Sequence, residues 1–107
     1  MINVKDGVRF KVLLPCIYDI FPVLVEIWKD KSGKKATITS ANDSTHGQKS
    51  LHYENRAIDV RSQDLSEQEK DTILSALKSK LNPIGYDVIL ESRGKTSEHF
   101  HIEYDPK

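Results

Sequence analysis

The fold is decided by residues 57–90, which read AIDVRSQDLSEQEKDTILSALKSKLNPIGYDVIL. Apolar residues flank Asp59 at the start of this stretch and predict a short strand. Ser66 and Glu69 then form a capping box, and apolar residues recur at helical spacing as far as residue 81. An asparagine, a proline and a glycine end the helix, and residues 86–90 read as a second strand. The stretch therefore predicts a strand, a helix and a strand.

The segments on either side add one helix and two strands. Apolar residues recur at helical spacing over 17–28, with Pro22 either kinking this helix or marking a late start. Residues 36–39 predict a short strand, and residues 101–104 predict a last strand after a polar turn around Gly94. Because helices and strands do not alternate strictly, we expect an α+β domain with a largely antiparallel sheet flanked by two main helices.

Length and composition fit one small domain that spans residues 1–107. The chain carries 16 basic and 16 acidic residues, so its charge gives no sign of a nucleic-acid-binding surface. Its single cysteine, Cys16, cannot form an internal disulfide, which fits synthesis in a reducing compartment. The longest apolar stretch is too short and too interrupted for a membrane span, and we find no signal peptide. We expect a monomer made in the cytoplasm, without membrane insertion.

The four histidines, at positions 46, 52, 99 and 101, and one aspartate suggest a metal site. Asp59 lies between two apolar residues, where an unpaired charge is costly to bury, so we expect a cation or metal partner. Zinc binds imidazole and carboxylate groups, and three protein ligands leave its fourth position open. His52, Asp59 and His101 form such a set. The alternative is that Asp59 pairs with Arg56 or Arg61 and that the histidines are ordinary surface residues.

Two separated motifs carry a family resemblance. The first reads SLHYENRAID at residues 50–59, and the second reads EHFHIEY at residues 98–104. The first resembles the serine, histidine, alanine and aspartate motif of the zinc D-alanyl-D-alanine carboxypeptidase and dipeptidase family, and the second resembles that family's glutamate and histidine motif. Among members of this fold, a chain this short is most similar to small phage or prophage cell-wall endopeptidases. Hedgehog-type signalling domains share the same zinc arrangement.

The resemblance implies a role for each motif residue. His52, Asp59 and His101 would bind Zn²⁺, and Glu98 would act as general base on the attacking water. Because neighbouring residues of a strand face opposite sides, Glu98 can reach the metal only if the strand begins after it. His99 is the competing candidate, either as the base or as a group that hydrogen-bonds near the oxyanion.

The residues that would bind substrate depart from the family pattern. An arginine that family members carry shortly before the first motif has no counterpart at 38–44. Four other residues could supply its positive charge: Arg56, Arg93, Lys49 and His46. Ser50 could hydrogen-bond a substrate carboxylate or merely cap a turn. Without the arginine, we expect cleavage inside cross-linked stem peptides to exceed cleavage of free D-alanyl-D-alanine, because a buried carboxylate needs a strong donor.

These patterns favour a zinc metallopeptidase that hydrolyses a peptide bond in peptidoglycan stem peptides, as an endolysin-like endopeptidase or a carboxypeptidase. Such an enzyme would reach the cell wall after release or as part of a phage particle. The alternative is a zinc-stabilised, non-catalytic binding module of the same fold. Glu98 favours the enzyme, whereas the absent arginine favours the module. A third reading is a small domain without metal.

Overall fold

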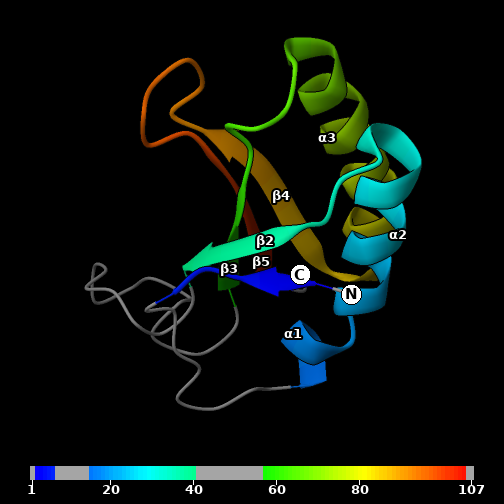
Figure 1. Ribbon diagram of the computed structural model, residues 1–107. Coiled ribbons are helices and arrows are strands. Elements are labelled where there is room, and N and C mark those ends of the chain that lie inside the picture. Colours follow the sequence, from blue (N-terminus) through cyan, green and yellow to red (C-terminus); the bar gives the residue numbers. More distant parts are fainter. Residues whose placement is uncertain (1, 7–14, 41–56, 106–107) are drawn as a thin grey trace.

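The computed structural model describes residues 2–6, 15–40 and 57–105 of the chain. Its elements follow in the order β1 (Asn3–Val4), α1 (Pro15–Tyr18), α2 (Phe21–Ser32), β2 (Thr37–Ser40), β3 (Ala57–Arg61), α3 (Glu67–Leu81), η1 (Asn82–Ile84), β4 (Tyr86–Glu91) and β5 (His99–Tyr104). The strands form one sheet in the order β1-β2-β3-β5-β4, and α2 and α3 pack side by side against one of its faces (Figure 1). Only β1 and β2 are parallel among these neighbours. The predicted α+β domain with a largely antiparallel sheet is thus confirmed.

The apolar stretch at 17–28 forms two helical segments instead of one. Pro22 lies in the first turn of α2, where its missing N–H removes no helical hydrogen bond, so it marks a late start rather than a kink. Ile17 and Ile20 precede α2 and are nevertheless buried. Gly33 ends α2 in the left-handed conformation at φ 70°, which glycine adopts without steric cost.

The capping box at the start of α3 is present as predicted. The Glu69 N–H donates to Ser66 Oγ at 3.1 Å, and the Ser66 N–H donates to Glu69 Oε1 at 2.9 Å. This fixes where α3 begins and turns its apolar face, with Ile73 and Leu77 fully buried, toward the sheet. The core between the layers also contains Trp28 of α2 and Phe100 of β5, whose rings meet edge to face with centroids 5.4 Å apart.

Strand β5 lies between β3 and β4 and carries most of the second motif. It begins at His99, two residues earlier than predicted, and pairs with β3 on one side and β4 on the other. Phe100 and Ile102 point into the core and are fully buried, so His99 and His101 face the side of the sheet opposite α2 and α3. No helix in the described part of the chain is long and apolar enough to cross a membrane.

Candidate metal centre

Three adjacent strands bring together four side chains that could hold a metal ion: Asp59 of β3, Glu91 of β4, and His99 and His101 of β5. Asp59 pairs with His101 across the β3–β5 ladder, and Glu91 pairs with His99 across the β4–β5 ladder. Residues that are direct partners point to the same face of a sheet. The register therefore determines which side chains form this group, here called the metal group.

The atoms of the metal group lie within hydrogen-bonding distance of one another. Asp59 Oδ1 is 2.9 Å from His101 Nδ1 and 3.4 Å from His99 Nε2. Glu91 Oε1 is 3.1 Å from His99 Nε2 and 3.5 Å from His101 Nδ1. One ligand atom from each of the four residues can be chosen so that all lie within 4.8 Å of one another. These distances place all four groups around one common point.

The hydrogen bonds of His99 determine which ring nitrogen carries its proton. Nδ1 lies 2.8 Å from the carbonyl oxygen of Ser97, which can only accept, so Nδ1 is the donor. In the neutral ring, Nε2 then presents a lone pair toward Asp59 and Glu91. His99 therefore offers the metal group either a ligand atom or a proton acceptor.

His101 is held between carboxylates on both sides of its ring. Nδ1 donates to Asp59 at 2.9 Å, and Nε2 donates to Glu103 Oε1 at 2.7 Å. Burial disfavours the charged ring, but the hydrogen bonds to Asp59 and Glu103 outweigh burial and raise the pKa of His101 to about 9. The metal-free ring is therefore an imidazolium at neutral pH, and a metal ion that binds at Nδ1 must displace its proton.

The chemistry of the metal group fits an ion of the zinc type. Imidazole nitrogens and carboxylate oxygens are ligands that zinc accepts, and Asp59 is only 8% exposed. Glu103 also accepts from the far nitrogen of His101, as carboxylates commonly do for histidines that bind metal. Two of the ligands predicted from the sequence, Asp59 and His101, are thus neighbours. The third, His52, lies outside the described residues, as do Ser50 and Arg56, and their roles stay predictions.

Glu98, predicted as the general base, is not part of the metal group, although it lines the same pocket as Asp59 and His99. Its Oε1 accepts from Ser62 Oγ at 2.6 Å and pairs with Lys70 Nζ at 2.8 Å, while its Oε2 accepts from the Gly94 N–H at 3.0 Å. Burial disfavours ionisation, but the hydrogen bonds from Lys70, Ser62 and Gly94 outweigh burial and lower the pKa of Glu98 to about 2. Glu98 precedes β5, as its predicted role requires, but its carboxylate forms an ion pair with Lys70 of α3, and its role as general base stays a prediction.

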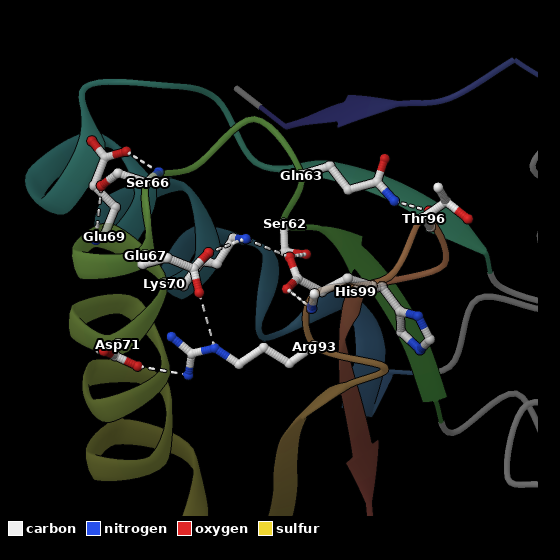
Figure 2. A network of polar contacts seen from close by, with 12 residues as sticks. Ser62, Gln63, Ser66, Glu67, Glu69, Lys70, Asp71, Arg93, Thr96 and His99 are labelled. Carbon is white, nitrogen blue, oxygen red and sulfur yellow. Dashed lines mark hydrogen bonds and ion pairs between the residues drawn. The ribbon is translucent and has the colours of Figure 1, made fainter.

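Arg93, predicted to bind substrate, is also turned toward α3. Its Nε pairs with Glu67 at 3.2 Å and its Nη1 with Asp71 at 2.8 Å. In Figure 2 the guanidinium reaches across to the helix, whereas the ring of His99 points away from this network. The arginine therefore links the turn between β4 and β5 to α3, and its predicted role in substrate binding stays a prediction.

Glu91 is the residue of the metal group that the sequence patterns did not identify. It ends β4, where the prediction had placed only an apolar strand over 86–90. The sequence does show a carboxylate directly after the predicted strand at 86–90. Which residue of β5 lies opposite Glu91, however, depends on the length of the turn between the two strands. Only the observed register places Glu91 opposite His99.

A pocket of about 380 Å³ opens beside Asp59 and His99. It extends from the metal group across β3 and β2 toward β1, with Arg61 and Lys5 also in its lining. The turn between β4 and β5 closes one side, where the Gln63 amide donates to the Thr96 carbonyl. A ligand in this pocket would lie directly beside the metal group.

Fold and site together define a small α+β domain with a candidate His, Asp and Glu metal site on one face of its sheet. A family model described as the Hedgehog amino-terminal signalling domain matches residues 20–99, about three quarters of the chain. The chain therefore belongs to the Hedgehog amino-terminal signalling domain family. The match includes Asp59, Glu91 and His99 and ends two residues before His101. None of the curated proteins matches the chain.

The family match agrees with part of the resemblance that the sequence motifs indicated. The sequence motifs resembled the zinc D-alanyl-D-alanine peptidases, with Hedgehog-type domains as relatives that share the zinc arrangement, and the match is to the Hedgehog family. It gives no name of a bacterial peptidase.

Proposed function

We propose that this domain is a zinc-dependent peptidase that hydrolyses a peptide bond in peptidoglycan stem peptides. The observation that carries the proposal is the metal group beside an accessible pocket. Asp59 and His101 would hold the ion together with His52, the third ligand predicted from the motif. A bound zinc ion would supply a Lewis acid that polarises the substrate carbonyl and lowers the pKa of water.

Glu91 and His99 are the residues best placed to move protons. Because Nδ1 of His99 donates to Ser97, the 3.1 Å contact between His99 Nε2 and Glu91 Oε1 is a hydrogen bond only when the pair holds one further proton. The pair can therefore take a proton from the attacking water as its oxygen bonds to the carbonyl carbon. When the C–N bond breaks, the same proton passes to the leaving nitrogen.

Two measurements on the purified chain test this proposal. Metal analysis reports whether zinc is bound, and mass spectrometry reports fragments released from intact peptidoglycan. We expect zinc in the wild type and in Glu91→Gln, with fragment release by the wild type only. Release that is unchanged in Glu91→Gln would remove Glu91 from the mechanism, and a chain without zinc that still releases fragments would refute the zinc dependence.

The second candidate function is a zinc-stabilised binding module without catalysis. It is favoured by the family itself, whose description is a signalling domain. The same two measurements separate the candidates, because the module predicts bound zinc without release of any fragment. A pull-down with intact peptidoglycan would then show whether the cell wall is its partner.

A further inference from the structure

Two basic side chains, Arg61 and Lys5, line the pocket beside the metal group. Arg61 follows Asp59 by two residues on β3 and is the ladder partner of His99, so it shares their face of the sheet. Lys5 follows β1, where its N–H donates to the Ile38 carbonyl at 2.9 Å. The two cations thus approach one pocket from β1 and β3, with β2 between them.

Neither cation has a partner that would neutralise it within the described part of the chain. The structure gives no hydrogen bond or ion pair there to the side chain of Arg61 or Lys5. Other basic side chains nearby are occupied, since Lys70 pairs with Glu98 and Arg93 pairs with Glu67 and Asp71.

The acidic side chains of the pocket are, in contrast, already paired. Glu98 is bound by Lys70 and Ser62, and its carboxylate is almost completely buried. Asp59 accepts from His101. Within the described part of the chain, the pocket therefore presents positive charge that an anionic ligand can neutralise. A carboxylate fits best, because the planar guanidinium of arginine can bind its two oxygens at once.

We infer that Arg61 and Lys5 bind a carboxylate of the peptide substrate while the bond to be cut lies at the metal group. The inference rests on the proposed function. Arg61 and Lys5 would supply the positive charge that residues 38–44 do not provide, because they contain no arginine. The carboxylate is either the end of the peptide chain or an acidic side chain next to the cleaved bond. Thr39 and Thr96 also line the pocket and add hydroxyl groups that can donate to the same anion.

Binding of a stem-type peptide ending in D-alanyl-D-alanine tests the inference. The peptide is used in three forms: with its free carboxylates, with an amidated C-terminus, and with its glutamate replaced by glutamine. Affinities are measured by NMR titration in a Glu91→Gln background, which keeps the peptide intact. Arg61→Gln and Lys5→Gln should each weaken binding of the free form about three- to tenfold, the range for a partly exposed charged contact.

The matched control is Arg93→Gln, which removes the same charge outside the pocket and should change the affinity less than about twofold, as for a distant exposed charge. The modified peptide that loses its sensitivity to Arg61→Gln identifies which carboxylate is bound. Affinities of the free form that stay unchanged in both pocket variants, or fall equally in Arg93→Gln, would overturn the inference, as would absence of binding by every peptide. Should Arg61→Gln fail to fold, Lys5→Gln and Arg61→Lys give the same comparison.

Binding is measured without cleavage, so this result is separate from that of the proposed function. A chain that binds the free peptide through Arg61 and Lys5 but releases no fragments from peptidoglycan would keep the carboxylate site and lose the peptidase. A chain that cleaves but shows no dependence on the two cations would keep the peptidase and lose the carboxylate site.

Discussion

Asp59 and His101 are direct partners on β3 and β5, and Asp59 Oδ1 lies 2.9 Å from His101 Nδ1. Both residues sit on strands of the sheet, flanked by the fully buried side chains of Val60, Phe100 and Ile102. Side chains on such rigid elements keep their relative positions with little loss of entropy when a ligand binds. The sheet therefore holds two candidate metal ligands at short distance from each other.

Removal of the metal should lower the thermal stability of the wild type. A ligand that binds only the folded state stabilises it by mass action, by about 4 kcal/mol at a free concentration one thousand times its Kd. We expect the Tm to fall when a chelator is added to the zinc-loaded wild type, and to stay constant in Asp59→Asn. Equal Tm values of the wild type with and without chelator would argue against a structural contribution from the metal.

Glu91→Gln should lower the rate of peptide hydrolysis by about two to four powers of ten, as expected for loss of a general base. Glutamine keeps the size of the side chain but cannot hold the proton. His99→Gln should cost less, because Glu91 remains. Glu98→Gln provides the decisive comparison, since its folded fraction should keep most of the activity. A greater loss in Glu98→Gln than in Glu91→Gln would return the role of base to Glu98.

Lys70→Met should destabilise the fold by about 3 kcal/mol, because it leaves the carboxylate of Glu98 buried without its cation. The side chain of Glu98 is 2% exposed and that of Lys70 is 10% exposed. The matched control is Lys34→Met, which removes the 3.8 Å pair with Glu69 and a hydrogen bond to the Asp64 carbonyl, both at the surface. That variant should lose less than about 1 kcal/mol. Urea unfolding measures both values, and equal losses would show that the Lys70–Glu98 pair has no special weight.

The ionised carboxylate of Glu98 should make the free energy of unfolding depend on pH. The pKa of Glu98 falls from 4.5 to about 2 in the folded chain, so the folded state holds this carboxylate ionised more strongly than the unfolded state does. Its contribution is therefore complete above pH 4.5 and is lost as the pH falls toward 2. Glu98→Gln should lack this part of the acid dependence. The free energy of unfolding is measured for the wild type and Glu98→Gln at pH 5.5 and pH 3, about the ends of that window. Equal losses of stability in the two proteins would show that Glu98 does not cause this part of the acid dependence.

Local sequence signals predicted most of the fold, because most of its elements are set by short-range chemistry. The capping box at Ser66 fixed the start of α3, and the apolar spacing fixed the buried face of α2. Strand β1 escaped notice because it has only two residues and depends on pairing with a distant segment, β2. No local pattern carries that information.

Only those residues of the candidate site that lie within the two sequence motifs could be predicted. The motifs predicted Asp59 and His101 as ligands, and the structure places them side by side, whereas Glu91 required the register of β4 against β5. The ion pair of Glu98 with Lys70 of α3 could not be predicted, because it joins residues far apart in the sequence. The contacts of Arg93 with Glu67 and Asp71 escaped prediction for the same reason, since these partners lie more than twenty residues away.

The zinc content of the purified chain measures directly whether Asp59 and His101 hold a metal ion. After loading with zinc and removal of the excess, elemental analysis should find about one zinc per wild-type chain, as for a single site of this ligand type. Asp59→Asn and His101→Gln should retain far less, while Arg93→Gln, altered outside the metal group, should retain as much as the wild type. A wild type without zinc would show that the metal group does not bind this ion. The same zinc content in Asp59→Asn and His101→Gln as in the wild type would show that these two residues are not its ligands.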